Sequence, residues 1–352
     1  MYHATDHAEL NLMIRGFQVS RMLRLVADLS IADRFPHRGE TDIAALAAAC
    51  GVLGTPLLRV LRALAAFGVF RVTAAGGIGH TPMSLLLRAD APQSLRPAAL
   101  ALAAPGSWGA WNELDAALTG EVPHRRAWNI GRFEYLREHP DEGRDFDLFM
   151  GQDPSDRHAA VAAACDFPGT PLIADIGGGN GALLRCILAR STHARGLVFD
   201  RAEVVSAIAS DGLMDGRLAT AAGNFFDHVP AGADHYLLVR VLHDWPDEDC
   251  VRILRNCRAA MHDGARLLVV ERILETDPAK GQPIEYLGDM QMMAMFGNAR
   301  ERTQAEFSAL LNAAGFEVIR LGATASSAFI IEAEVHVSGM RDLASSPPAG
   351  RL

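Results

Sequence analysis

The sequence contains little cysteine, and its cysteines form no motif. Only five occur in 352 residues, an odd number at scattered positions without a C-x-x-C pair. This distribution argues against both a disulfide framework and a cysteine-based metal site. We expect all five to be buried thiols without a catalytic or metal-binding role: Cys50, Cys165, Cys186, Cys250 and Cys257.

The chain also lacks an excess of positive charge and any long hydrophobic run. Its net charge of −9 argues against broad binding of nucleic acid or anionic membranes, which leaves small molecules as the expected partners. No apolar run approaches the ~20 residues that a membrane helix requires. The polar start at residues 1–7 is not typical of a signal peptide, so we expect a cytoplasmic protein.

One stretch organises what the chain does contain. The apolar run 172–176 leads into the glycine-rich segment 177–181 and then into a helical pattern from Ala182, which predicts a strand, a turn and a helix. Glycines let the backbone approach a ligand, and a helix N-terminus presents free N–H groups. Because Gly177, Gly179 and Ala182 also fit the dinucleotide pattern G-x-G-x-x-A, the stretch predicts a nucleotide-like cofactor without specifying which one.

Three helices and a β-hairpin are predicted near the start of the chain. The helical patterns begin near residue 10, at a Thr41 cap and near Pro56, and the hairpin covers 69–81. Such a winged-helix-like module can bind DNA, form a dimer or cover a site. The acidic charge and the leucine-rich third helix favour dimerisation or covering.

From residue 172 onward, predicted strands alternate with helices. The strands are 172–176, 197–200, 218–222, 236–242, 267–271, 316–321 and 327–335. The last two have no helix between them and are expected to pair antiparallel at a sheet edge. A capping box from Thr303 to Glu306 marks a helix start. The pattern predicts an α/β fold with a doubly wound, mostly parallel Rossmann-like sheet.

We divide the chain into four parts on this basis. They are a winged-helix-like module at 1–97, a helical connector at 98–168, the sheet domain at 169–336 and a disordered tail at 337–352.

Ligands of doubly wound sheets bind at the carboxyl ends of the strands. Asp200 ends the second strand, where an acid can accept hydrogen bonds from a ribose. After the third strand, Asn224 can hydrogen-bond an adenine edge while Phe225 packs on its face. The residues at these two ends predict a nucleoside-binding region.

A base is predicted at the end of the fourth strand. His243 lies there, and histidine can accept a proton near neutral pH. Glu271 follows the fifth strand and Glu301 precedes the capped helix. A carboxylate beside an imidazole fixes its tautomer, so these residues predict a base with orienting partners.

Methionines and aromatic residues supply candidates for a pocket. A Met-rich helix spans 289–296, and Phe149 with Met150 ends an earlier helical pattern. Core packing is the commoner role of such residues. Methionine also packs against flat aromatic rings, so Met292, Met295 and Phe296 can contact an aromatic ligand.

These motifs together resemble a known family. The glycine stretch, the Gly-Asn-Phe-Phe run at 223–226, the His-Asp-Trp motif at 243–245 and the Glu-Arg-Thr run at 301–303 are similar to those of S-adenosylmethionine-dependent O-methyltransferases of small molecules, the caffeate and flavonoid type with bacterial relatives. The resemblance covers almost the whole chain, including segment 61–70.

The resemblance implies a cofactor and roles for residues. The cofactor is S-adenosylmethionine, released as S-adenosylhomocysteine, and no metal is required. Cofactor-binding positions are Asp175, Gly177, Gly179, Asp200, Asn224, Phe225, Val239, Arg240 and Trp245. The general base is His243, supported by Glu271 and Glu301. Apart from the resemblance, the residues themselves give the expected substrate positions, which are Phe149, Met150, Asp244, Met292, Met295 and Phe296. The family further implies a homodimer formed through the N-terminal module.

Two departures from the family pattern affect these expectations. Asn224 stands where the family usually has aspartate, although its amide oxygen can still accept a hydrogen bond from adenine. Met295 and Phe296 stand where plant enzymes carry polar residues, which favours a more apolar aromatic acceptor. Oxygen is the expected methyl acceptor, with nitrogen and carbon left open. Two other readings are an NAD-dependent oxidoreductase and a winged-helix regulator that senses a ligand.

Overall fold

The computed structural model divides the chain into two compact units. It describes residues 4–151, 154–169, 171–208, 214, 216–326 and 328–336. Unit 1 comprises Met1–Asp153 with Ala294–Phe296, and unit 2 comprises Pro154–Met293 with Gly297–Leu352. The predicted tail at 337–352 lies outside the described residues, and the four-part division drawn from the sequence stays a prediction.

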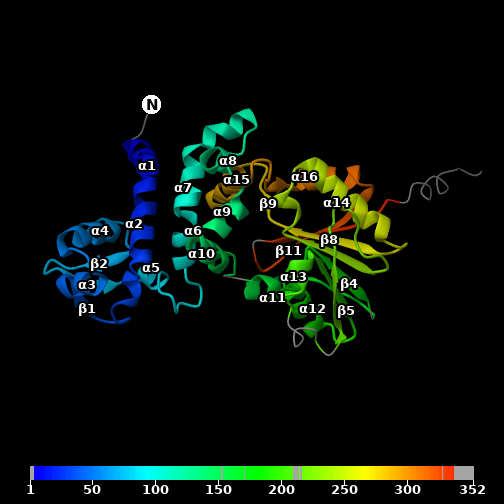
Figure 1. The fold of residues 1–352 in the computed structure, drawn as a ribbon, viewed down its shortest axis with the longest axis horizontal. Helices are drawn as coiled ribbons and strands as arrows, with labels where there is room; N and C mark the ends of the chain where they lie inside the picture. Colours follow the sequence, from blue (N-terminus) through cyan, green and yellow to red (C-terminus); the bar gives the residue numbers. More distant parts are fainter. Residues whose placement is uncertain are drawn as a thin grey trace, which may run out of the picture. The chain divides into compact units, whose positions relative to one another are not determined.

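Unit 1 begins with helices and a small sheet (Figure 1). Its first elements are α1 (Ala4–Ile14), α2 (Gly16–Asp28), β1 (Glu40–Asp42), α3 (Ile43–Cys50), α4 (Gly54–Ala66), β2 (Phe70–Val72), β3 (Gly77–His80) and α5 (Pro82–Leu85). The predicted hairpin is confirmed as β2 and β3, which pair antiparallel, and β1 pairs with the other edge of β3.

The predicted cap of the second helix is wrong by one residue. Asp42 caps α3, because its Oδ1 accepts hydrogen bonds from the amides of Ala44 at 2.8 Å and Ala45 at 3.2 Å. Thr41 instead pairs with Ile78 in the small sheet. Pairing with a strand that is distant in sequence therefore overrode the local capping signal.

The remainder of unit 1 is helical, as the sequence predicts. Its helices are α6 (Arg96–Leu102), α7 (Pro105–Asn112), α8 (Pro123–Trp128), α9 (Arg132–Glu138) and α10 (Pro140–Gly151). The helix α11 (Pro154–Ala164) continues the pattern within unit 2.

Unit 2 is built on a seven-stranded sheet. The strands are β4 (Leu172–Ile176), β5 (Arg195–Asp200), β6 (Leu218–Ala222), β7 (His235–Val239), β8 (Arg266–Glu271), β11 (Phe316–Ala323) and β12 (Phe329–Val335). Their order is β11-β12-β8-β7-β4-β5-β6. The pairs from β8 to β6 are parallel, whereas β12 is antiparallel to both β8 and β11. The predicted fold class and the antiparallel edge pair are confirmed.

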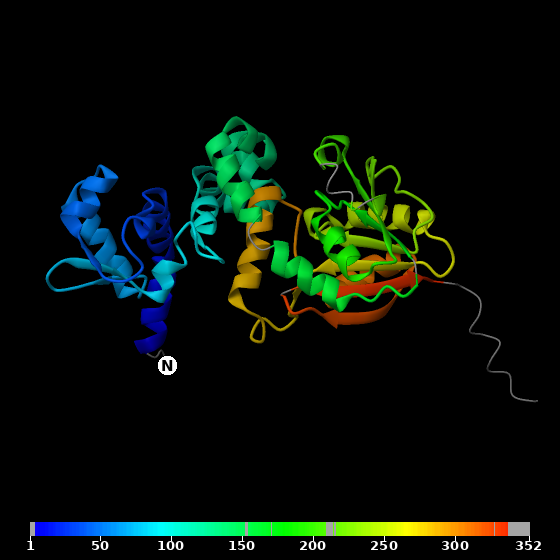
Figure 2. The same cartoon turned by 90° about the horizontal axis from the view of Figure 1, so that it is seen from below.

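Helices cover both faces of this sheet, as Figures 1 and 2 show. They are α14 (Asp247–Ala260) and α16 (Gln304–Ala313) on one face, and α11, α12 (Ala182–Arg190) and α13 (Ala202–Val205) on the other. The chain also forms α15 (Pro283–Phe296) and a short parallel pair, β9 (Ile273–Leu274) and β10 (Arg302–Thr303). One core lies between the sheet and α14 with α16, and a second lies between the sheet and α11 with α12. Because side chains of the sheet take part in both cores, both faces of the sheet are buried.

The expected burial of the cysteines is only partly correct. Cys250 and Cys257 are buried, while Cys50, Cys165 and Cys186 are partly exposed, and all five are free thiols. Cys50 ends α3 and Cys186 lies on α12, whereas Cys165 follows the end of α11.

Within the part of the chain that the structure describes, no single helix has the length and apolar character needed to cross a bilayer. The pair α3 and α4 meets that criterion only when joined across a bend of 109°.

Candidate active site

The predicted site residues of unit 2 gather where the strand order reverses. β4 lies between β5, which leads to β6, and β7, which leads to β8. The chain leaves the sheet in opposite directions from β4 and β7, and this opens the position where ligands bind in such folds. The carboxyl ends of these strands carry the glycine segment, Asp200, His243 and Glu271.

The glycine segment adopts backbone conformations that favour glycine. Gly177 has φ 73° and Gly179 has φ 57°, both in the left-handed region that side chains disfavour. A Cβ atom at Gly177 would also lie 2.9 Å from Val241 Cγ2. The Gly177 amide donates to the carbonyl of Phe199 at 2.8 Å, so the loop is attached to β5.

Two carboxylates lie beneath and beside this loop. Asp175 is 2% exposed, and its Oδ1 has no hydrogen-bond partner among the described residues. Burial, with Asp200 nearby, raises the pKa of Asp175 to about 7. Asp200 Oδ2 accepts a hydrogen bond from the Gly179 amide at 2.9 Å. The glycine loop is therefore tied to the acid that ends β5.

An aromatic cluster follows β6. The Phe225 and Trp245 ring centroids are 6.0 Å apart and those of Phe226 and Trp245 are 4.7 Å apart, both pairs edge-to-face. Asn224 Oδ1 accepts from the Phe226 amide at 3.0 Å, and its amide donates to Asp227 at 3.2 Å. The Asn224 side chain thus closes its own turn beside the aromatic rings.

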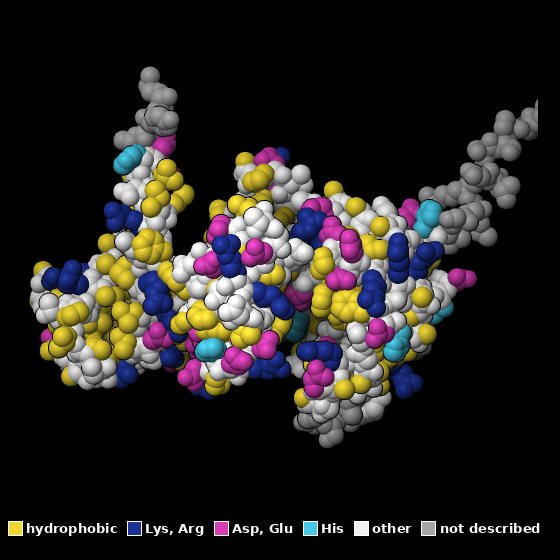
Figure 3. Space-filling view, turned by 45° about the horizontal axis from the view of Figure 1, so that its top comes forward, with side chains coloured by type: hydrophobic (Ala, Val, Ile, Leu, Met, Phe, Trp, Pro, Cys, Tyr) yellow, Lys and Arg dark blue, Asp and Glu magenta, His cyan; other side chains and the backbone are white. Residues whose placement is uncertain are grey.

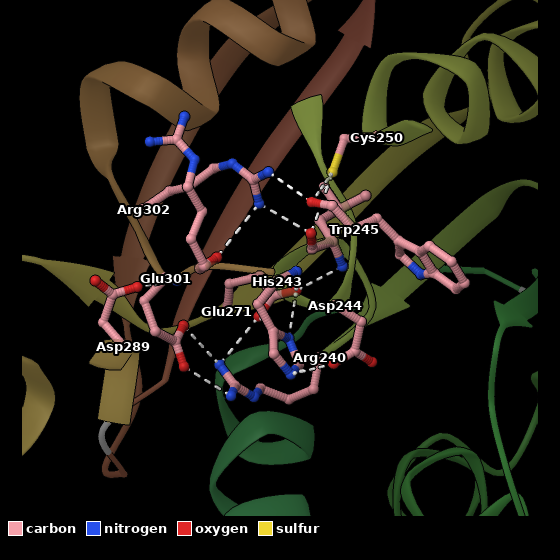
Figure 4. Close-up of polar contacts among 11 residues, drawn as sticks. Arg240, His243, Asp244, Trp245, Cys250, Glu271, Asp289, Glu301 and Arg302 are labelled. Atoms are coloured by element: carbon pink, nitrogen blue, oxygen red, sulfur yellow. Dashed lines mark hydrogen bonds and ion pairs between the residues drawn. The ribbon is translucent and has the colours of Figure 1, made fainter. Parts of the chain in front are cut away.

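His243 lies in a 3₁₀ turn, Leu242–Asp244, and is 7% exposed. The fourth strand was predicted to reach residue 242, but it ends at Val239, so the turn is free to point its side chains into the site. His243 Nδ1 is 3.1 Å from Glu271 Oε2, and Nε2 is 3.2 Å from Asp244 Oδ1 (Figure 4). The imidazole therefore has a carboxylate at each nitrogen.

Glu271 is fully buried and ionised. Its Oε1 accepts from the Leu242 amide at 2.9 Å, which holds the start of the turn against the end of β8. Burial alone would raise the pKa of Glu271, yet His243 and Arg240 outweigh it and lower the pKa below its ordinary value. Desolvation within the site raises the pKa of Asp244. The two carboxylates beside His243 thus differ in acidity.

Glu301 reaches the histidine only through Arg240. The Arg240 guanidinium donates to both oxygens of Glu301, at 2.8 and 3.0 Å, and to Glu271 Oε2 at 3.1 Å. Figure 4 shows the guanidinium lying between these carboxylates. The side chain of Arg240 is committed to the two glutamates, and Val239, the last residue of β7, precedes it.

The sequence did not single out Arg302, Arg300 or Asp289 as site residues. Arg302 is fully buried and donates to the Leu242 and Trp245 carbonyls at 2.9 and 2.8 Å. The Arg300 amide donates to the His243 carbonyl at 2.9 Å. Asp289 Oδ1 accepts from the amide of Glu301 at 2.8 Å. Arg302 lies within the Glu-Arg-Thr run and Arg300 directly precedes it, whereas Asp289 lies 12 positions before Glu301, at the start of the predicted Met-rich helix.

The expected substrate residues are divided between the two units. Asp244 and Met292 belong to unit 2, and the other four belong to unit 1: Phe149, Met150, Met295 and Phe296. Met295 is 4% exposed and packs with Ala110, so it forms part of the core of unit 1. The Phe296 ring lies 5.4 Å from that of Phe133, between centroids, and Met150 is exposed.

No group of three or more histidine, cysteine or acidic residues suited to hold a metal ion is found in the described ranges.

Comparison with known proteins gives consistent matches along the chain. The O-methyltransferase domain family matches residues 111–317. The chain is 38% identical to phenazine O-methyltransferase PhzM of Lysobacter antibioticus, over 91% of this chain and 94% of that protein. Among solved structures it is similar to mitomycin 7-O-methyltransferase MmcR, with a TM-score of 0.83 and 31% identity over 94% of this chain and 98% of that one. It is also similar to the S-adenosylhomocysteine-bound methyltransferase CalO1 of calicheamicin biosynthesis, with a TM-score of 0.80 and 30% identity over 96% and 100% of the two chains.

Proposed function

This chain belongs to the S-adenosylmethionine-dependent O-methyltransferases, and we propose that it methylates a hydroxyl group of a small aromatic molecule with His243 as the general base. The observation that carries the proposal is the contact of His243 Nδ1 with the buried carboxylate of Glu271 at 3.1 Å. A carboxylate in that position orients the ring and stabilises the imidazolium that forms when the base takes a proton.

The residues at the strand ends fit the cofactor. A Cβ atom at Gly179 would meet nothing within 4 Å, so the backbone of the loop is open to a ligand there. Oδ1 of Asp175, without a partner among the described residues, is an acceptor for a donor on a ligand. Asp200 suits a ribose diol, and the ring cluster of Phe225 and Trp245 suits an adenine face. When bound, S-adenosylmethionine supplies a methyl group activated on a sulfonium.

The two nitrogens of His243 have different tasks. Because Nδ1–H donates to Glu271, Nε2 is the nitrogen that accepts the proton of the substrate. Asp244 Oδ1 lies 3.2 Å from Nε2, and its side chain is 49% exposed. We propose that during catalysis the acceptor hydroxyl takes the position beside Nε2 that the Asp244 carboxylate occupies in this structure. The Asp244 side chain then turns toward solvent.

The acceptor is an aromatic hydroxyl compound. A phenol with pKa ~10 is mostly protonated at neutral pH, so removal of its proton creates the nucleophile. General base catalysis contributes about 10²–10⁴-fold, and positioning of the two substrates adds to it. The names of the phenazine and mitomycin relatives support a polycyclic acceptor. The apolar residues Met292 and Phe296 support the same class.

The N-terminal module forms a homodimer. Unit 1 contains an apolar groove of about 630 Å³ between α2, α5, α6 and α7, lined by residues such as Leu23, Leu102 and Trp108. Helix α1 exposes further apolar side chains, and Figure 3 shows hydrophobic side chains gathered along α1 and the adjoining surface of unit 1. A contiguous apolar surface of this kind marks an interaction site, and we assign it to a second copy of this chain.

Calorimetry and labelled methyl transfer test the proposed function. S-adenosylhomocysteine should bind, NADH should not, and label from S-adenosylmethionine should appear in an ether of at least one hydroxylated polycyclic aromatic compound. Binding of NADH without binding of S-adenosylhomocysteine would overturn the assignment. Label found solely on nitrogen or carbon would contradict the hydroxyl acceptor.

A further inference from the structure

Arg240 lies at the centre of the charged groups around His243. We propose that Arg240 is a positioning residue, which holds Glu271 and Glu301 side by side as carboxylates and thereby limits the negative potential at His243. The inference rests on the proposed role of His243 as the base. It differs from the cofactor contact that the family resemblance implies for this position.

The contacts of Arg240 require a guanidinium. Nη1 donates to Glu271 Oε2 at 3.1 Å and to Glu301 Oε2 at 3.0 Å, while Nη2 donates to Glu301 Oε1 at 2.8 Å. Glu271 is 0% and Glu301 is 4% exposed. Two buried carboxylates this close repel each other unless a cation pairs with them. The planar fork of arginine can satisfy both, whereas a lysine ammonium cannot match that geometry.

The backbone of Arg240 supports the same assignment. Its φ of 54° lies in the left-handed region, which costs energy for a residue other than glycine and persists where the surroundings require it. The Arg240 amide nevertheless donates to the Val270 carbonyl at 3.0 Å, so β7 stays attached to β8. The strained residue connects β7 to the turn that carries His243.

Charged groups from several elements lie around this turn. They are Asp244 on the turn itself, Asp247 on α14, Glu271 and Arg272 at the end of β8, Asp289 on α15, and Arg300, Glu301 and Arg302 around β10. Asp244 and Glu271 contact His243 directly. Arg240 contacts Glu271. Glu301 joins them through Arg240. This inner group contains three carboxylates and one guanidinium.

Within this inner group, the positive charge of Arg240 acts directly on the imidazole. Arg240 Nη1 and His243 Nδ1 each lie 3.1 Å from the same atom, Glu271 Oε2, so the two nitrogens are at most twice that distance apart. A positive charge this near disfavours the imidazolium. Without it, the negative potential of the surrounding acidic groups would favour the imidazolium, which cannot accept the proton of the substrate.

The test follows the proton on His243 as a function of pH. NMR of the imidazole ring in the cofactor-free protein gives the midpoint of its titration without reference to activity. In Arg240→Gln we expect this midpoint to rise by roughly 1–2 pH units. The acid limb of the pH–rate profile should shift to higher pH together with this midpoint, so that the activity lost at pH 7 returns at higher pH. An unchanged midpoint would overturn the proposal.

Matched variants separate charge from fold. Arg240→Lys keeps the charge and should leave the midpoint near its original value, with a lower turnover because the fork is lost. Arg266→Gln removes a positive charge from the opposite end of β8 and should leave the midpoint unchanged. In the double variant Arg240→Gln with Glu301→Gln, two carboxylates remain, the same excess of negative charge as in the original group. Its midpoint should return toward the original value, and failure to return would contradict the charge argument.

Two measurements distinguish this inference from a cofactor-binding role of Arg240 and from the proposed role of His243 as the base. S-adenosylhomocysteine affinity should be nearly equal in Arg240→Gln and the unaltered protein; a large loss with an unchanged midpoint would make Arg240 a cofactor ligand. If His243→Ala were fully active, the proposed base would be wrong, whereas the NMR midpoint would still report whether Arg240 sets the charge of that ring.

Discussion

The guanidinium of Arg302 donates to the carbonyl oxygen of Leu242 at 2.9 Å, across 60 positions of sequence. The same group donates to the Trp245 carbonyl and to Asp247 Oδ1, at 2.8 and 2.7 Å. The residue that follows Glu301 therefore holds both ends of the turn that carries His243. Movement of either element would displace the imidazole from Glu271.

Replacement of Arg302 should weaken both the fold and the turn. In Arg302→Met, two carbonyls lose a donor, and leaving a buried acceptor unsatisfied costs about 1–3 kcal/mol. The half-exposed Asp247 keeps Arg300 as a partner, so its lost ion pair adds little. We expect lower stability in denaturant unfolding and lower turnover at saturating cofactor. Arg302→Lys keeps the charge and should retain more of both. Equal stability of Arg302→Met and the unaltered protein would show that the hydrogen bonds of Arg302 do not stabilise the fold.

Removal of the imidazole should abolish the base without disturbing the cofactor region. His243→Ala is expected to lower turnover by at least ~10²-fold, while calorimetry finds nearly unchanged affinity for S-adenosylhomocysteine. His262→Ala, in the turn after α14, removes an exposed histidine and serves as the control. Retention of full activity in His243→Ala would mean that another group removes the proton.

Asp175 should make the stability of the cofactor-free protein depend on pH. Because burial raises its pKa to about 7 in the folded state, the unfolded chain releases this proton at lower pH than the folded one. Stability should therefore fall as pH rises from about 4 to 7, by up to ~4 kcal/mol. Asp175→Asn lacks the ionisable group, and unfolding at pH 5 and pH 8 should show a smaller decline.

The exposed Asp263 provides the comparison for that experiment. Asp263→Asn should keep the full decline between pH 5 and pH 8, because it leaves Asp175 in place. If Asp175→Asn showed the same decline, burial of this carboxyl would not control the pH dependence.

A charge in the apolar groove of unit 1 should separate the proposed dimer. Leu102 lines the groove and is 43% exposed, so Leu102→Glu is expected to give monomers in light scattering with an unchanged circular dichroism spectrum. Ile319→Glu on β11 alters a residue that is equally exposed, at 43%, and should remain dimeric. A dimer that persists in Leu102→Glu would place the interface elsewhere.

Local signals in the sequence predicted much of unit 2. The bounds of β4 and β6 agree with the predicted strands, and the capping box between Thr303 and Glu306 is confirmed. These features depend on side-chain alternation, capping chemistry and glycine conformations within a few residues, which neighbouring sequence is sufficient to specify. Membership in the family is likewise confirmed, because it rests on ordered motifs along the whole chain.

Partners distant in sequence were beyond those signals. The capping role of Asp42 depends on how Thr41 pairs with Ile78. The order of β12 between β8 and β11 depends on packing of the completed sheet. In both cases, a long-range contact selects between local alternatives that are close in free energy.

The charged residues around His243 show most clearly which features local sequence specifies and which depend on the folded chain. Residue types and spacing placed His243 and Glu271 after the fourth and fifth strands, whose carboxyl ends meet at one edge of the sheet, and placed Glu301 before the capped helix. Folding assigned the partners: Glu271 lies against His243, while Glu301 lies against Arg240, 61 positions away. The pairing of carboxylates with cations depends on the backbone conformation at Arg240 and on the hydrogen bonds of Arg302. Neither feature produces a periodic pattern in the sequence.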